Sequence, residues 1–325
     1  MALLPLLHTP PGQEARPPAA IEENVEVVRV IDGDTLVVRL DGRETTVRLA
    51  FVDTEEKISG RPLSSPSKPE TIFGQETALW AQDFFAALGT PPHVGLSFPE
   101  GRREDVYGRL LARVILPDGR DFDRLLVELG RSPYFNKYGN SRTDHEEFVR
   151  AQDEARRRQL GLWNPATNRA RTEGAPSAVR PYEKLIPWWN ARAAAIDEFR
   201  RRREADPAHW ISPEDETELV QACERCRKDP ALRVTLFTTV ERFFEEADGS
   251  LTVLLRGYGK HDVRARLGGE GRTALEGFLR SSTEEFRQNY LCVEGRLERD
   301  ARGIRLVAPE RGSWRVAEPR YPGGD

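Results

Sequence analysis

The sequence predicts an α+β protein built from two small β-barrels with helices packed on them. The first observation is a set of three short runs in which apolar and polar residues alternate, separated by Asp32-Gly33 and Asp41-Gly42. Asp-Gly between such runs is a strong indication of hairpins. The second observation is a helical pattern followed by two further strand patterns. The third is that the same order, three strands, a helix and two strands, recurs in the last third of the chain. That order is typical of the five-stranded OB barrel.

Length and composition set the limits of this prediction. The chain has 325 residues, enough for two domains, and 38% hydrophobic with 31% charged residues is typical of a folded, soluble protein. No apolar run approaches the roughly 20 residues that cross a bilayer, so we expect no membrane partner. The net charge of -4 does not by itself indicate nucleic-acid binding, which would have to depend on local arginines.

The elements of the first barrel follow from periodicity and from turn residues. Period-two alternation predicts strands, helical spacing of apolar residues predicts helices, and glycine marks several ends. The predicted strands are Val25 to Val30, Thr35 to Leu40, Thr45 to Phe51, Val94 to Phe98 and Leu110 to Leu116, and the predicted helices are Phe73 to Leu88, Phe122 to Leu129 and Asp144 to Gln159.

The domain boundaries are predicted from shifts in composition. Residues 1–24 are rich in proline and lack a basic start, which favours a flexible tail and a cytoplasmic protein. A degenerate secretion signal remains an alternative. The predicted order is the tail 1–24, the first barrel domain 25–164, a linker 165–181, a helical segment 182–230 that becomes helical after Pro187, an OB-like domain 231–317 and a tail 318–325.

The second barrel is predicted from strands at Val234 to Phe244, Ser250 to Tyr258, Asp262 to Leu267, Tyr290 to Arg299 and Ile304 to Ala308, with a helix from Gly271 to Ser281. Its basic and aromatic residues predict either a nucleic-acid-binding face or an ordinary charged surface, and a protein partner of this barrel also stays open. These residues are Tyr258, Lys260, Arg264, Arg266, Arg296, Arg299 and Trp314.

The three cysteines are an odd number, which argues against a framework of disulfides. Cys223 and Cys226 have the spacing of metal ligands but no second pair accompanies them. Two small residues on one face of a helix are the favoured interpretation.

The chemistry of the chain is concentrated at the ends of the first three strands. Asp34, Asp53 and Glu56 lie at or just beyond strand ends, and Arg48 lies on the strand between the two aspartates. Carboxylates on a rigid sheet are hard oxygen ligands for Ca2+ or Mg2+, and a guanidinium supplies a planar fork of donors for a phosphate. Arg109, at the start of another strand, adds a second such fork. Together they predict metal-assisted cleavage of a phosphodiester. The alternative is ordinary turn chemistry, in which these aspartates only form hairpins and caps.

A loop from Arg131 to Arg142 interleaves aromatic and basic residues. Tyr134, Lys137 and Tyr138 suit stacking on an unpaired base beside a phosphate. Filling of the core is the equally weighted alternative for these rings.

Several motifs together carry a family resemblance. Val30-Ile31-Asp32-Gly33-Asp34-Thr35, Val47-Arg48-Leu49, Val52-Asp53-Thr54 with Glu56, and Asp105 with Tyr107-Gly108-Arg109 resemble the staphylococcal nuclease (thermonuclease) family over roughly residues 25–164. The resemblance implies that Asp34, Asp53 and the carbonyl of Thr54 hold one Ca2+. It also implies that Glu56 orients or deprotonates water and that Arg48 and Arg109 clamp the phosphate. The substrates it implies are DNA and RNA, with 3′-phosphate products, and we expect single strands to be preferred and Tyr107 to join the substrate-binding residues.

One position departs from the family. A proline usually separates the threonine from the catalytic glutamate, whereas Glu55 stands there in this chain. This change leaves the predicted fold intact and bears on rate and metal preference. The rival functional hypothesis is a non-catalytic nucleic-acid- or protein-binding module, although such modules usually lose the carboxylates and arginines that are present here.

Overall fold

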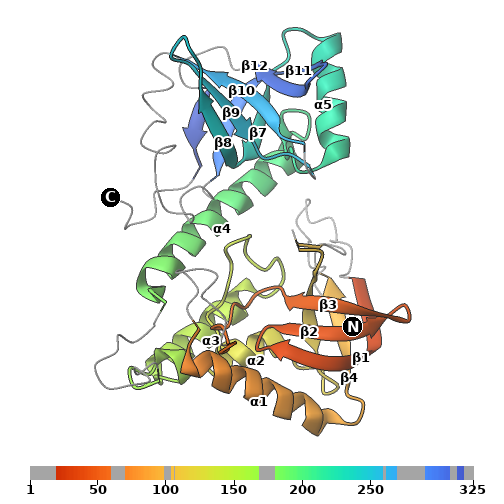
Figure 1. Cartoon of the computed structure of the whole chain (residues 1–325), viewed down its shortest axis with the longest axis vertical. Coiled ribbons are helices and arrows are strands. Elements are labelled where there is room, and N and C mark those ends of the chain that lie inside the picture. The colour runs from red at the N-terminus through yellow and green to blue at the C-terminus, as the bar shows by residue number, and fades with distance from the viewer. Residues whose placement is uncertain are drawn as a thin grey trace, which may run out of the picture. The chain divides into compact units, whose positions relative to one another are not determined.

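The computed structural model describes residues 20–59, 70–98, 104–105, 107–167, 180–258, 261–268, 290–307 and 313–317. The chain divides into two compact units, shown in Figure 1. One contains Met1–Tyr134 and Arg142–Ala178, and the other contains Phe135–Ser141 and Val179–Asp325. Among the described residues, no helix is both long enough and apolar enough to cross a membrane.

Five strands of the first unit close into a barrel in the order β1-β2-β3-β5-β4. The pairing of β3 with β5 is parallel, and the other neighbours are antiparallel. This confirms the predicted fold class. β1 begins at Ala20, inside the predicted tail, because the chain there already pairs with β4. The strands are β1 (Ala20–Asp32), β2 (Thr35–Leu40), β3 (Arg43–Leu49), β4 (His93–Phe98) and β5 (Leu110–Ile115).

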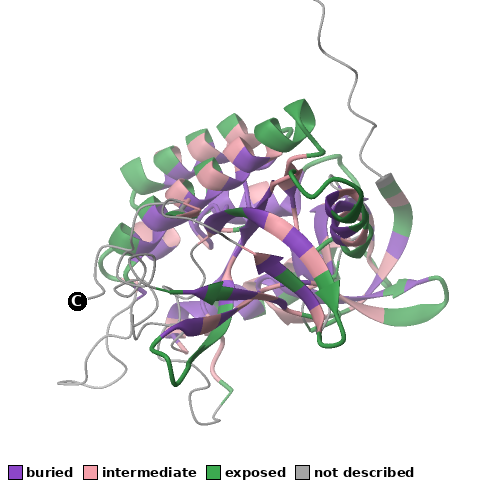
Figure 2. Ribbon diagram, turned by 90° about the horizontal axis from the view of Figure 1, so that it is seen from above, coloured by how far each residue is buried: buried purple, intermediate pink, exposed green. Residues whose placement is uncertain are grey.

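The turn between β2 and β3 has the predicted hairpin chemistry. Asp41 and Gly42 have φ values of 51° and 73°, the left-handed backbone that a tight two-residue hairpin requires. Most residues of β2, β4 and β5 are buried or half-buried, as the colours of Figure 2 show, and the apolar ones meet in one core. The barrel interior is therefore filled by side chains and leaves the chemistry to its rim.

Four helical elements accompany the barrel: α1 (Ile72–Leu88), α2 (Phe122–Glu128), α3 (His145–Arg157) and the 3-10 turn η1 (Gly161–Trp163). The Thr71 hydroxyl caps α1 by accepting the N–H of Gly74 at 2.9 Å. The Asp121 carboxylate caps α2 by accepting the N–H of Asp123 at 2.9 Å. Both capped ends lie next to segments that carry predicted site residues.

The second unit contains a larger sheet in the order β6-β7-β11-β12-β10-β9-β8, with β13 paired to β11. One predicted strand is split at Thr239 into β7, which pairs with β11, and β8, which pairs with β9. β10 and β12 are parallel. If β7 and β8 are counted as one bent strand, the second unit has the same strand pairings as the first barrel. The bent strand, β9, β10, β11 and β12 then correspond to β1, β2, β3, β4 and β5. The elements are α4 (Tyr182–Ala205), β6 (Trp210–Ile211), α5 (Glu216–Lys228), β7 (Val234–Thr238), β8 (Val240–Glu245), β9 (Leu251–Leu255), β10 (Val263–Leu267), β11 (Leu291–Asp300), β12 (Gly303–Val307) and β13 (Trp314–Val316).

Two details of the second unit differ from the sequence prediction. α4 begins at Tyr182, so Pro187 lies inside the helix and does not precede it. The loop Phe135–Ser141 was predicted within the first domain, but it belongs to the second unit. It packs on α4, where the ring of Phe135 lies 4.9 Å from that of Trp189. The predicted helix from Gly271 to Ser281, most of the linker and the C-terminal tail lie outside the described residues.

Candidate active site

A buried arginine joins the two predicted metal ligands. Arg48 lies opposite Thr35 in the β2–β3 register, and only 8% of the residue is exposed. Its Nη2 donates to Asp53 Oδ1 at 2.6 Å and lies 3.1 Å from Asp34 Oδ2. Burial opposes its charge, but the nearby carboxylates of Asp34, Asp53 and Glu56 raise the pKa of Arg48. The guanidinium therefore stays protonated between the carboxylates.

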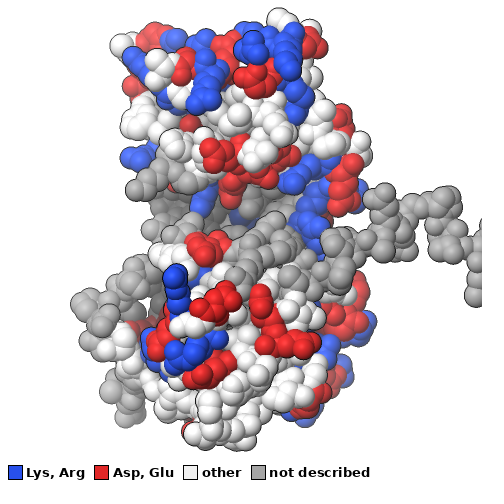
Figure 3. Space-filling model, turned by 90° about the vertical axis from the view of Figure 1, so that its right-hand side faces the viewer, with Lys and Arg blue, Asp and Glu red and all other residues white. Residues whose placement is uncertain are grey.

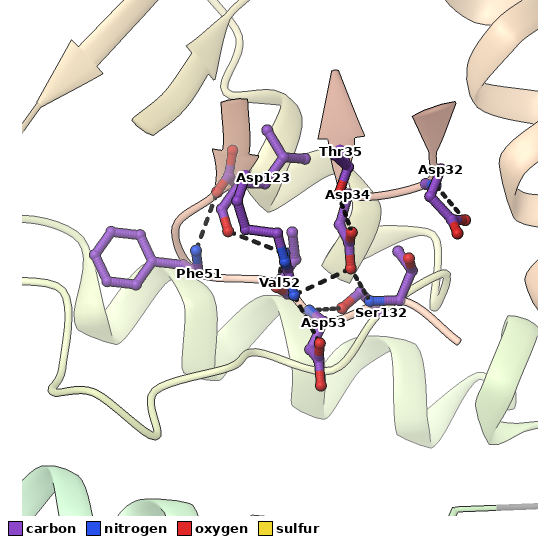
Figure 4. A network of polar contacts seen from close by, with 12 residues as sticks. Asp32, Asp34, Thr35, Phe51, Val52, Asp53, Asp123 and Ser132 are labelled. Carbon is purple, nitrogen blue, oxygen red and sulfur yellow. Dashed lines mark hydrogen bonds and ion pairs between the residues drawn. The ribbon is translucent and has the colours of Figure 1, made fainter. Parts of the chain in front are cut away.

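The segment after β3 carries Asp53 to Glu56 and leaves the sheet, so its backbone needs other partners. Its backbone N–H groups donate to side chains from three segments that are far away in the sequence (Figure 4). The N–H of Phe51 donates to Asp123 Oδ1 at 3.1 Å, that of Asp53 to Ser132 Oγ at 2.9 Å, and that of Thr54 to Asp34 Oδ2 at 2.9 Å.

The carbonyl groups of the same segment are also held. Arg48 Nη1 donates to the carbonyl of Val52 at 2.7 Å and to that of Leu49 at 3.1 Å. Arg48 thus binds both the carboxylates and the backbone that presents them. This arrangement fixes the position of Asp53 without a neighbouring strand.

Two glycines let other elements approach this segment closely. A Cβ atom on Gly74 of α1 would lie 2.2 Å from the carbonyl oxygen of Glu56 and 2.7 Å from that of Glu55. A Cβ atom on Gly33 would lie 2.7 Å from Thr77 and 2.9 Å from Thr54. A larger residue at position 74 would therefore displace the backbone of Glu56, and one at position 33 would press on the side chains of Thr77 and Thr54.

The site has an excess of negative charge. Burial and the charge of Asp34 raise the pKa of Asp32 to about 7, with Glu56 contributing in the same direction. Asp34, Asp53 and the Thr54 carbonyl are hard oxygen donors, so their chemistry fits a Ca2+ ion. The set has only two carboxylates, and no group of three or more His, Cys, Asp or Glu side chains gathers as a metal cage in the parts of the chain that are described.

Arg109 directly precedes β5. Two residues further on, Leu111 pairs with Arg48 across the parallel β3–β5 ladder. The guanidinium of Arg109 pairs with Asp105 at 2.7 Å and lies 5.4 Å from the ring centre of Tyr107, a residue that is 80% exposed. Partial burial acts to raise the pKa of Asp105, but hydrogen bonds from Arg109 outweigh it and lower this pKa.

The aromatic loop is divided between core and surface. Tyr134 is 2% exposed and its ring stacks on Phe148 at 4.8 Å, so this residue has no free face for a base, contrary to the sequence hypothesis. Tyr138 is 62% exposed, and the Lys137 ammonium lies 5.7 Å from its ring centre. Lys137 is half-buried, and its ammonium also lies 5.1 Å from the ring centre of Trp188. Lys137 and Tyr138 both belong to the second unit.

Sequence reasoning missed three residues of the site. Asp32 adjoins Asp34 in the same motif, and its place in a hairpin turn concealed its burial. Asp123 and Ser132 lie 72 and 79 positions from the backbone groups they bind, and no local pattern marks them. Their role depends on the tertiary fold alone.

Comparison with known proteins agrees with this geometry. Residues 46–165 match the family described as staphylococcal nuclease homologue. A thermonuclease from Staphylococcus hyicus is 32% identical over 149 residues, which cover 45% of this chain and 78% of that protein. The chain belongs to the staphylococcal nuclease family. An uncharacterized endonuclease from Escherichia coli O157:H7 is 30% identical over 140 residues, 43% of this chain and 76% of that protein. Endonuclease YncB from Bacillus subtilis (strain 168) is 30% identical over 149 residues, 45% of this chain and 65% of that protein.

The family resemblance predicted from the motifs is confirmed. Because the matched region ends at residue 165, this staphylococcal nuclease family member carries a second unit that the family match does not cover.

Proposed function

We propose that the protein is a Ca2+-dependent nuclease that hydrolyses phosphodiester bonds of single-stranded DNA and RNA. The observation that carries this proposal is the buried Asp34–Arg48–Asp53 arrangement at the rim of a barrel whose relatives include a thermonuclease and endonucleases. The two carboxylates can bind a cation, and the guanidinium beside them can bind a phosphate.

Asp34, Asp53 and the Thr54 carbonyl are the proposed Ca2+ ligands. When bound, the ion supplies Lewis-acid polarisation of the phosphate and neutralises part of its charge. The chain itself fixes the ligands, because Arg48, Ser132 and Asp34 hold the backbone around Asp53 and Thr54. That rigidity favours a ligand set formed before the substrate arrives.

Arg48 and Arg109 are the proposed phosphate clamp. Arg48 keeps its charge in a buried place, where donors aimed at developing negative charge have their largest effect. Arg109 pairs with Asp105, and 31% of its side chain is exposed, so the pair is weak enough to exchange for a phosphate oxygen.

Glu56 is the proposed base that orients water and accepts its proton. The water oxygen forms a bond to phosphorus, the bond from phosphorus to the 5′-oxygen breaks, and the 5′-oxygen takes up a proton from solvent. The product retains a 3′-phosphate, as the family analogy implies. The Glu56 carbonyl accepts the N–H of Thr71 at 3.1 Å, which anchors this residue to the start of α1. Tyr107, beside Arg109, is the proposed substrate contact of this unit.

A cleavage assay tests this function. We expect labelled single-stranded DNA and RNA to be cut by the full chain with Ca2+, poorly with Mg2+, and not in excess chelator. Glu56→Gln should abolish cleavage while Ca2+ binding persists. Cleavage that survives in chelator, or in Glu56→Gln, would contradict the proposed roles. Oligonucleotide binding without cleavage under every metal condition would instead favour the non-catalytic binding module.

A further inference from the structure

The second barrel presents a surface, here called the outer face, on strands β8, β9, β10 and β12. Leu251, Val253 and Leu255 of β9 are buried, so the residues between them point outward. Cross-strand pairing then aligns two rows of outward side chains. One row is Phe244, Thr252 and Arg266, and the other is Arg242, Leu254, Arg264 and Arg305.

The basic side chains of the outer face are bordered by acidic ones. The two rows contain four arginines. The Thr252 hydroxyl donates to Glu246 at 2.6 Å, and Glu298 lies opposite Arg305 in the β11–β12 register. The acids that pair with these arginines come from the borders of the outer face: Asp248 pairs with Arg266, Asp300 with Arg264, and Glu298 of β11 with Arg305.

The border pairs differ in exposure. The side chains of Arg264 and Asp300 are 26% and 36% exposed, and those of Arg305 and Glu298 are 52% and 21% exposed. The pair in the row of Phe244 is the most open. The side chains of Arg266 and Asp248 are 65% and 56% exposed. Pairs this exposed contribute at most about 1 kcal/mol, so a phosphate group can replace the carboxylate. Basic and acidic side chains are intermixed on the surface shown in Figure 3, so binding of a polyanion must depend on such local groups.

The outer face also offers a ring. Phe244 is 50% exposed, and its row continues to Arg266. Phe243 next to it is 39% exposed but pairs with inward-facing Val253, so it points to the other side of the strand. Thr252 separates Phe244 from Arg266 in this row. A ring and a guanidinium on one face of a sheet complement a base and a phosphate of one strand.

The location of the outer face agrees with this chemistry. β9 and β10 are the second and third strands of an OB-type order, the region through which such barrels bind oligonucleotides. Among the described elements, α5 packs mainly on β11 and β6. Arg242, Phe244 and Arg266 are exposed to solvent, and Arg264 is half-buried.

We propose that the outer face binds a single strand of DNA or RNA, with arginines on the phosphates and one base stacked on Phe244. The choice of ligand rests on the proposed nuclease function. The chain then holds its substrate with both barrels, and attachment at one barrel raises the effective concentration at the other.

The test is the affinity of the full chain for a labelled oligothymidylate, measured by fluorescence anisotropy in EDTA so that no cleavage occurs. Phe244→Ala should weaken binding about tenfold, the scale for loss of one stacked base. Phe243→Ala is the matched control and should bind like the parent. Equal affinity of Phe244→Ala and parent, or equal losses in both variants, would overturn the proposal.

A second variant tests the arginines. Arg264→Gln combined with Arg266→Gln should weaken binding and reduce the slope of log affinity against log salt by roughly one unit. An unchanged slope, or equal binding of a DNA duplex, would also overturn the proposal. Cleavage of a short oligonucleotide with Ca2+ is measured in parallel. Absent cleavage with Phe244-dependent binding refutes the nuclease alone, and normal cleavage with Phe244-independent binding refutes the outer face alone.

Discussion

The two barrels share an acid–arginine pair at the same topological position but differ in how they bury it. In the first barrel, Asp34 at the turn between the first two strands pairs with Arg48, opposite Thr35. In the second barrel, Asp248 at the corresponding turn pairs with Arg266, opposite Thr252. The side chains of the first pair are each 10% exposed, whereas those of the second are 65% and 56% exposed.

The difference shows that topology supplies a position and the covering segments supply the chemistry. In the first barrel, the segment that carries Asp53 lies against the pair and brings a second carboxylate to Arg48. Removal from water strengthens these interactions, whereas solvent screens the exposed pair of the second barrel. We therefore expect catalysis at the buried pair and reversible binding at the exposed one.

The largest effect should come from breaking the buried arrangement. Arg48→Ala and Arg109→Ala should each reduce turnover roughly 10²-fold or more, because each removes a donor to the transition state. Arg120→Ala is the matched control, since its pair with Asp118 is 56% and 51% exposed on the same barrel. Steady-state cleavage of a short oligonucleotide provides the measurement. Near-parental turnover in folded Arg48→Ala would show that this arginine is only structural.

A smaller effect should follow from loosening the covering segment. Ser132→Ala leaves the buried N–H of Asp53 without its acceptor, which should cost about 1–3 kcal/mol of unfolding free energy and weaken Ca2+ binding. The free energy is measured by urea unfolding and the affinity by calorimetry. Ser97→Ala, on buried β4, is the control, and it should leave Ca2+ affinity unchanged. A loss of stability in Ser132→Ala with unchanged Ca2+ affinity would separate the serine from the site.

The third effect acts on the pH dependence of stability and not on turnover. Burial and the charge of Asp121 raise the pKa of Asp123 to about 7 from its ordinary value of 3.8. The folded chain therefore binds this proton more tightly than the unfolded chain, and the stabilisation is lost as pH rises from about 4 to 7.

Asp123→Asn removes this titration, so its stability relative to the parent should increase over that pH range. Urea unfolding at several pH values measures the difference. A difference that stays constant with pH would contradict the assignment, and Asp118→Asn serves as an exposed control.

The sequence predicted the barrels well where the signal is local. Alternating runs around Asp41-Gly42 specify the β2–β3 hairpin, and the left-handed backbone there confirms it. The break at Thr239 was not predictable, because no glycine or proline marks it; hydrogen bonds with Arg256 hold the bend.

The site could be predicted only in part for the same reason. The motifs identify Asp34, Arg48 and Asp53, which the structure brings together. Asp123 and Ser132 act through contacts that only the folded chain creates. Composition could not distinguish buried Tyr134 from exposed Tyr138, since both occur in one loop of mixed character.

The most direct test of the comparison is a calorimetric Ca2+ titration of the parent, Asp34→Asn and Asp248→Asn. These two variants remove the same type of carboxylate from the corresponding turns of the two barrels. We expect one Ca2+ per chain in the parent and in Asp248→Asn, and at least roughly tenfold weaker binding in Asp34→Asn, because the proposed ligand set lies in the first barrel. Equal Ca2+ binding by all three proteins, or a loss in Asp248→Asn alone, would contradict this account.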